Sequence, residues 1–237
     1  PRLAGQPSAP LRFAVAARAK GPLAGCTTDD CLRALLVSAL QAGLIDGALA
    51  YSQDPWTMQP VPCLASTPAE AADCRGPQGL WSPVLDQLND AIFRRRLSRL
   101  AVVGTPCVAQ GVARLRGGSG YRYAPYRQAL RLIVATFCTA VCDPELVGRL
   151  LREEAGLEAW QVRRFTSVEG EDNLQIDLID GSQRTLPLHR AQQFTRRGCA
   201  YCSDYAGAAA DLSLGSVGAA EGWSSLLVRT ALGEAVL

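Results

Sequence analysis

Apolar residues along the chain fall into short continuous runs that alternate with amphipathic stretches. Continuous runs of this length, bounded by turn residues, are typical of buried strands. Residues 160–190 instead alternate like antiparallel strands, and Asp180-Gly181 is placed to form their hairpin turn. The pattern therefore predicts a paired antiparallel region there, and buried strands within residues 11–17, 44–51, 52–79, 100–104 and 130–137.

The amphipathic stretches predict the helices. Residues 31–40 carry apolar positions at helical spacing, and Asp29 or Asp30 is placed to cap them. A second helix is predicted to start at Ser82, since serine is a good N-cap and the proline that follows suits a first turn. Further helices are predicted through residues 112–115 and over 144–155. Helices that alternate with buried strands indicate an α/β protein, a mixed sheet with flanking helices plus the antiparallel β region.

Composition indicates the general class of protein. The chain has 237 residues, 48% of them hydrophobic and 19% charged, which is typical of a globular protein with a substantial core. We expect a single domain over residues 1–237, with a sub-domain break near 117–120, where the sequence is most linker-like. A formal net charge of +2 gives no argument for nucleic acid or an anionic membrane as partner.

Neither a membrane span nor a signal peptide is predicted. No apolar run approaches the roughly 20 residues that a bilayer requires, and the N-terminal segment lacks a compact apolar core. We expect a cytoplasmic protein. Two arginine clusters, 94–96 with Arg99 and 196–197, are interpreted as solvated surfaces or, alternatively, as a docking patch for an acidic electron carrier.

Nine cysteines are many for a chain of this size, and in a reducing compartment they favour metal ligation over disulfides. Cys199 and Cys202 form a CxxC pair, while Cys107 and Cys138 each end an apolar run. Four thiolates are what a [4Fe–4S] cluster takes from a protein. A four-cysteine zinc site and inert buried thiols are the alternatives, but structural zinc usually draws two close CxxC pairs.

The C-terminal block is the most specific part of the sequence. Residues 198–205 read GCAYCSDY, 210–218 read ADLSLGSVG, and 222–224 read GWS. Together with AGLIDGA at 42–48, GTPC at 104–107 and Phe137-Cys138, this chain resembles the beta subunit family of coenzyme F420-reducing hydrogenases and dehydrogenases, which includes chlorophyll-pathway reductases. The resemblance covers nearly the whole chain from about Gly25.

The resemblance implies an iron–sulfur flavoprotein that passes electrons between a [4Fe–4S] cluster, FAD and a second redox cofactor such as F420. It implies that Cys107, Cys138, Cys199 and Cys202 are the cluster ligands. The redox partner would be ferredoxin or a hydrogenase or dehydrogenase subunit, within an oligomer or complex. By the same resemblance, the residues near the flavin or second substrate are Ser82, Ser213, Gly215, Ser216, Gly218, Gly222, Trp223 and Ser224.

One segment departs from the family pattern. Asp29-Asp30-Cys31 stands where relatives have a Ser-Gly-Gly-like turn, and two carboxylates there would repel a pyrophosphate. This favours a non-catalytic accessory subunit that keeps the cluster and has lost FAD as one alternative. A ferredoxin-dependent tetrapyrrole reductase is the other.

The remaining candidates are weaker. Cys26 and Cys31 with Cys63 or Cys74 could ligate a second cluster, although ordinary thiols are the simpler interpretation. Cys142 could replace Cys138 as a ligand. His189 is the only histidine, which disfavours serine-triad hydrolysis and histidine-rich metal sites.

Overall fold

The computed structural model describes residues 9–25, 27–77, 79–167, 173–187, 189–190 and 193–237. Within these residues a large mixed sheet has the strand order β1-β10-β9-β5-β4-β2-β3. Its four central strands, β9, β5, β4 and β2, run parallel, whereas β1, β10 and β3 pair antiparallel at the two sides. The bounds are β1 Phe13–Ala17, β2 Gly47–Gln53, β3 Pro60–Ala65, β4 Leu100–Gly104, β5 Leu130–Thr136, β9 Leu212–Gly215 and β10 Ser224–Val228.

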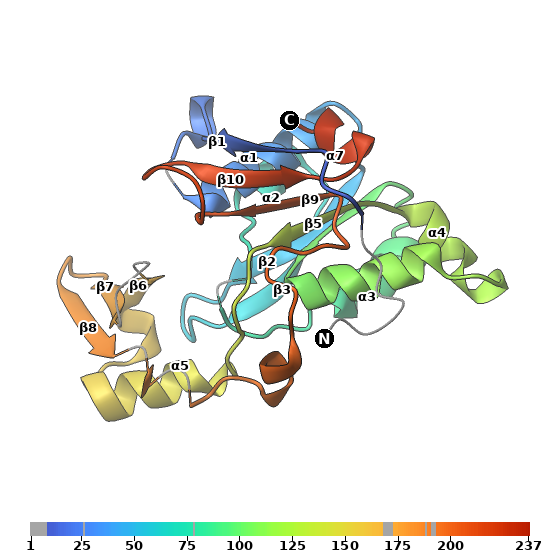
Figure 1. Ribbon diagram of the computed structural model, residues 1–237. Coiled ribbons are helices and arrows are strands. Elements are labelled where there is room, and N and C mark those ends of the chain that lie inside the picture. The colour runs from blue at the N-terminus through green and yellow to red at the C-terminus, as the bar shows by residue number, and fades with distance from the viewer. Residues whose placement is uncertain (1–8, 26, 78, 168–172, 188, 191–192) are drawn as a thin grey trace.

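Helices cover both faces of this sheet (Figure 1). On one face α1 (Thr28–Gln41) and α2 (Pro68–Ala72) pack with the C-terminal α7 (Ala231–Ala235), and on the other lie α3 (Pro106–Gly117) and α4 (Ala124–Ala129). Alternate residues of one strand serve the two cores: Ala101 and Val103 of β4 face α1, while Leu100 and Val102 face α3. The predicted α/β class with a mixed sheet and flanking helices is confirmed.

Local sequence explains where α1 begins. Thr27, rather than Asp29 or Asp30, is its N-cap, and the Thr27 hydroxyl accepts the backbone N–H of Asp30 at 3.2 Å. The Asp30 carboxylate in turn accepts the Thr27 N–H at 3.0 Å, which completes a capping box. Gly43, with φ +64°, follows the end of the helix, at a position where glycine is favoured.

The smaller sheet has the order β6-β7-β8, all antiparallel, with β6 Val162–Ser167, β7 Asn173–Leu178 and β8 Gln183–Pro187. The predicted turn at Asp180-Gly181 joins β7 to β8, and Gly181 has φ +85°. With α5 (Glu145–Leu150) and a π-helical turn over Leu151–Ala155, this sheet encloses its own apolar cluster around Leu151 and Ile176.

Two further predictions needed correction. The helix expected from Ser82 is a 3-10 turn, Val84–Gln87, followed by a π-helical turn, Asp90–Arg94, and Ser82 caps neither of them. The spacing of Val84, Leu88 and Phe93 predicts one buried face, but Phe93 is exposed. Residues 52–79 hold α2 as well as the expected strand. Residues 117–120 run from the last residue of α3 to the turn before α4, and a sub-domain break there stays a prediction.

Within the described ranges, every helix is too short or too polar to cross a bilayer.

Candidate functional site

The carboxyl ends of the parallel strands meet at one edge of the large sheet, and two of the predicted ligand cysteines lie just beyond them. β4 ends at Gly104, and Cys107 sits in the first turn of α3; β5 ends at Thr136, two residues before Cys138. β4 and β5 are adjacent and parallel, so their ends coincide. This is the edge of an α/β sheet at which ligands usually bind.

The CxxC pair approaches the same region from a distant part of the sequence. A 3-10 turn over Arg197–Tyr201 carries Cys199, and Cys202 follows directly. The Cys199 sulfur accepts the backbone N–H of Val141 at 3.5 Å, three residues beyond Cys138. The Cys202 thiol contacts the Asp204 carbonyl oxygen at 3.8 Å. All four cysteines are free, with Cys107 and Cys202 exposed and the other two half-buried.

The Cys138 thiol lies close enough to the other three predicted ligands for their charges to affect its pKa. Burial, and after it the charges of Cys107, Cys199 and Cys202, raise the pKa of Cys138 to about 12. Burial, and after it the charges of Cys107 and Cys138, also raises the pKa of the buried Tyr51. Among the described residues, no three Cys, His, Asp or Glu side chains are close enough to hold a single metal ion. The four-cysteine metal site therefore stays a prediction.

A polar network holds the CxxC segment against the rest of the site. The Gln110 amide on α3, one turn beyond Cys107, donates to the Asp204 carboxylate at 2.9 Å. That carboxylate also accepts the Ala208 N–H at 3.1 Å. Behind it, the buried Arg229 donates to the Ser213 hydroxyl at 2.7 Å and to the Ala206 carbonyl at 3.1 Å.

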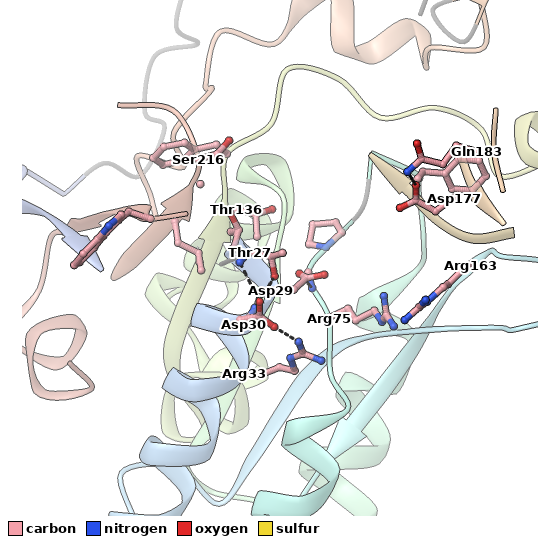
Figure 2. A pocket seen from close by; sticks show the side chains of 18 of the residues that line it. Thr27, Asp29, Asp30, Arg33, Arg75, Thr136, Arg163, Asp177, Gln183 and Ser216 are labelled. Atoms are coloured by element: carbon pink, nitrogen blue, oxygen red, sulfur yellow. Dashed lines mark hydrogen bonds and ion pairs between the residues drawn. The ribbon is translucent and has the colours of Figure 1, made fainter. Parts of the chain in front are cut away.

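Beside the cysteines a cleft of about 990 Å³ opens between the two sheets (Figure 2). Its walls are the carboxyl ends of β5 and β9, the N-terminus of α1, the segment around Gly76, and β6 and β7 of the smaller sheet. Its volume falls at the upper end of the range for ligand sites. The cleft lining includes Thr27, Asp29, Asp30, Arg33, Arg75, Gly76, Thr136, Phe137, Arg163, Asp177, Gln183, Tyr205, Leu214, Gly215, Ser216 and Trp223.

The two aspartates at the N-terminus of α1 are occupied by the protein's own groups. The Asp29 carboxylate accepts the Gly76 N–H at 2.9 Å. Asp30 forms the capping box and an ion pair with Arg33. Burial acts to raise the pKa of Asp30, but hydrogen bonds from Thr27 and the Arg33 guanidinium outweigh it and hold the pKa below its usual range. The expected repulsion of a pyrophosphate is thus reduced.

Positive charge remains available in the cleft. Within the described part of the chain, Arg75 and Arg163 line it without an ion-pair partner, whereas Asp177 is held by the amides of Gln175 and Gln183. Among the described residues of the lining, two polar atoms also lack partners: the Thr136 hydroxyl and Nε of Arg33. Buried polar groups are normally hydrogen-bonded, so these two atoms are available to a polar ligand.

Two aromatic side chains that line the cleft are close in sequence to predicted ligand cysteines. The rings of Phe137 and Tyr205 both line the cleft, with centroids 5.3 Å apart. Phe137 immediately precedes Cys138. Gly215 makes room for this pair, since a Cβ there would lie 2.1 Å from the Phe137 ring.

The predicted flavin residues divide into two groups. Gly215, Ser216 and Trp223 line the cleft. The other predicted residues are absent from the described lining: Ser213 is buried against Arg229, and Ser82 is buried with an unpartnered hydroxyl, beside Trp81, whose ring lies under Arg196. The roles predicted for Ser82, Ser213, Gly218, Gly222 and Ser224 stay predictions.

Of the other cysteines, Cys63 and Cys74 contact each other, Cys31 points to the Ala17 carbonyl, and Cys26 lies outside the described residues. Cys142 is half-buried, and burial is the main cause that raises its pKa, with the charge of Cys199 contributing. His189 is exposed. Sequence reasoning missed Arg75, Arg163 and Asp177, for which no local motif exists because distant segments bring them together.

Comparison with known proteins agrees with this architecture. The family profile for the C terminus of the coenzyme F420 hydrogenase/dehydrogenase beta subunit matches residues 97–237, and the profile for the N terminus matches residues 15–89. This chain belongs to the coenzyme F420 hydrogenase/dehydrogenase beta subunit family. The resemblance inferred from the cysteine and glycine motifs is confirmed.

Individual proteins of this family match most of the chain. An uncharacterised protein of Methanocaldococcus jannaschii is 34% identical over 93% of the chain, which spans 61% of that relative's length. The coenzyme F420 hydrogenase subunit beta of Methanococcus voltae is 28% identical over 85% of the chain and 70% of its own length. A solved chain of the F420-reducing [NiFe] hydrogenase complex from Methanosarcina barkeri superposes with a TM-score of 0.85 at 25% identity, covering 98% of this chain and 78% of that one. The family is thus one of oxidoreductase subunits.

Proposed function

We propose that this chain is an iron–sulfur flavoprotein subunit that passes electrons between a [4Fe–4S] cluster, FAD and a second redox cofactor such as F420. The observation that carries the proposal is that Cys107 and Cys138 follow two adjacent parallel strands and Cys199 contacts Val141 near them, at the sheet edge that also borders a large, partly cationic cleft. Relatives named as F420 hydrogenase subunits support F420 as the second substrate.

The donor set fits an iron–sulfur cluster. Cys107, Cys138, Cys199 and Cys202 are free thiols, and the charges of the other three contribute to the raised pKa of Cys138. A cube of four irons is larger than a single ion, so its ligands stand further apart than those of zinc.

The cleft fits a flavin dinucleotide. Arg75 and Arg163 can neutralise the pyrophosphate, since arginine binds phosphate bidentately. The unpartnered Thr136 hydroxyl offers a donor or acceptor in the cleft lining, and Gly76 leaves little more than backbone beside it. A Cβ on Gly76 would lie 3.1 Å from the Thr136 methyl.

When bound, the cluster would supply single electrons and the flavin would exchange one or two. The chain's own residues set the geometry. Cys138 donates its N–H to the Tyr205 carbonyl at 3.0 Å, which fixes the cysteine against the aromatic wall of the cleft. The Phe137 and Tyr205 rings pack against each other beside the cleft, and the Gln110–Asp204 bond holds α3 to the CxxC segment.

Absorption spectroscopy of the anaerobically purified protein tests the proposal. Flavin bands together with a broad cluster shoulder are expected, and the Cys199→Ser variant should lose the shoulder. A shoulder without flavin would instead support the accessory subunit, and a spectrum with neither feature would refute the redox function.

The second substrate needs a separate assay. With an artificial electron donor, the flavin-loaded protein should reduce F420, whereas a tetrapyrrole reductase would leave F420 unchanged. The electron partner is proposed to be ferredoxin or another subunit of a hydrogenase or dehydrogenase complex, since the matched structure is part of such a complex. The exposed Cys202 lies where such a partner could approach.

A further inference from the structure

Two cysteines outside the proposed ligand set lie in direct contact. Cys63 is in β3, and Cys74 follows the short helix α2, so that eleven positions separate them. Their sulfur atoms are 3.4 Å apart. For a disulfide to form, the two sulfur atoms must move roughly 1.4 Å closer to each other, which is within the reach of side-chain rotation.

The surroundings give the two thiols different roles. Cys63 is half-buried, whereas Cys74 is almost fully buried, with 1% of its surface exposed. The sulfur–sulfur contact, in which either thiol can donate, lowers the pKa of Cys63 despite burial, and the Ala50 backbone N–H adds to this. The same contact, with burial, raises the pKa of Cys74. The more accessible sulfur is therefore the better nucleophile, and the buried one is placed to resolve a mixed disulfide.

We propose that Cys63 and Cys74 form a redox-active dithiol that closes to an intramolecular disulfide by exchange with a small disulfide compound. The Cys63 thiolate attacks one sulfur of that compound, forming a mixed disulfide and releasing one thiolate. The Cys74 sulfur then attacks Cys63, loses its proton to solvent and displaces the second thiolate. The small disulfide is reduced to two thiols, and the protein loses two hydrogens.

The pair is connected to the cleft by the chain itself. Arg75 follows Cys74 directly, and its backbone pairs with Tyr51 of β2 through bonds of 2.7 and 3.2 Å. Gly76, next along, donates to Asp29 at the N-terminus of α1. A Cys63–Cys74 disulfide would tie β3 to this segment, so the thiol state is placed to adjust Arg75 and Gly76 in the cleft wall.

Peptide mass analysis of the full-length chain tests the pair without reference to flavin or cluster. The sequence has no Lys or Arg between Arg33 and Arg75, so trypsin releases residues 34–75 with only these two cysteines. After incubation with oxidised glutathione and alkylation, that peptide should be two hydrogens lighter and unalkylated. Cleavage at Glu70 should then leave its two parts joined until a reductant is added.

Three variants control the result. Cys63→Ser should leave Cys74 alkylatable, and Cys74→Ser should trap glutathione on Cys63 as a stable mixed disulfide. Cys31→Ser, at another buried thiol of the same core, should leave the disulfide unchanged. Circular dichroism confirms that each variant is folded. Full alkylation of both cysteines in the treated wild-type peptide, or glutathione retained on wild-type Cys63, would overturn the proposal whatever the flavin content.

Discussion

The backbone N–H of Cys138 donates to the carbonyl oxygen of Tyr205 at 3.0 Å. Cys138 belongs to the proposed cluster ligands, and Tyr205 lines the cleft proposed for the flavin. A displacement of the Tyr205 backbone is therefore expected to move the backbone of a proposed cluster ligand. Groups that contact a metal ligand from behind orient it in this way.

Substitution of Gly215 tests this coupling. In Gly215→Ala the new Cβ would lie 2.1 Å from the Phe137 ring, so Phe137 has to move and Cys138 with it. We expect a stability loss of about 1–3 kcal/mol, measured by denaturant unfolding, and loss of bound flavin. Gly111→Ala on α3 is the control, because nothing lies within 4 Å of its Cβ position; flavin loss in that variant as well would contradict the coupling.

Asp204 is predicted to matter for the metal content although it is not a ligand. Asp204→Ala removes the acceptor of Gln110 and of the Ala208 N–H, so the CxxC segment loses its tie to α3. We expect iron per chain to fall severalfold, because removing a group that supports a ligand typically costs roughly 10–100-fold in metal affinity. The exposed neighbour Ser203→Ala should retain its iron. Equal iron in the two variants would show that Asp204 does not support the ligands.

The sequence predicted the cysteine placement because strand ends are a topological property. The apolar runs before Cys107 and Cys138 are local signals, and parallel pairing brings their ends together. The cap of α1 is Thr27 rather than the predicted aspartate, because Asp30 belongs to the same capping box. A local pattern identifies the box but not which member is the cap.

Most residues of the cleft lining could not be predicted from the sequence. Arg75 follows α2, and Arg163 lies in the smaller sheet, so their meeting depends on how two sheets are arranged. The helix expected from Ser82 breaks into two short turns although its apolar spacing is helical. Val84 and Leu88 are nevertheless buried in the same apolar cluster as residues of α3.

Acid sensitivity follows from the lowered pKa of Asp30. Its hydrogen bonds from Thr27 and its ion pair with Arg33 stabilise the folded state fully above the unfolded pKa, near 3.8, and this contribution is lost as the pH falls through the lower folded value. Asp30→Asn should destabilise the protein at pH 7 by about 1 kcal/mol. Its difference from wild type should shrink below pH 4 in unfolding experiments.

The exposed Asp86→Asn serves as the control for that series. It should track the wild-type stability at every pH. A deficit for Asp30→Asn that stays constant down to pH 2 would mean that the capping box and ion pair contribute nothing through ionisation.

Removal of a cleft arginine should weaken the flavin without disturbing the cluster. Arg163→Ala deletes a guanidinium without an ion-pair partner among the described residues, so we expect a 10- to 100-fold weaker flavin affinity, about 1.5–3 kcal/mol. Fluorescence titration of the flavin-free protein measures it. Arg184→Ala, exposed on β8 and outside the cleft lining, is the matched control. Equal affinities would place the pyrophosphate elsewhere.

Iron and acid-labile sulfide in anaerobically prepared Cys138→Ser and Cys142→Ser proteins test the proposed cluster most directly. The two cysteines are four positions apart, and both are half-buried. We predict about four irons per chain in wild type and in Cys142→Ser, and almost none in Cys138→Ser. Full iron in Cys138→Ser, or loss confined to Cys142→Ser, would contradict the ligand assignment.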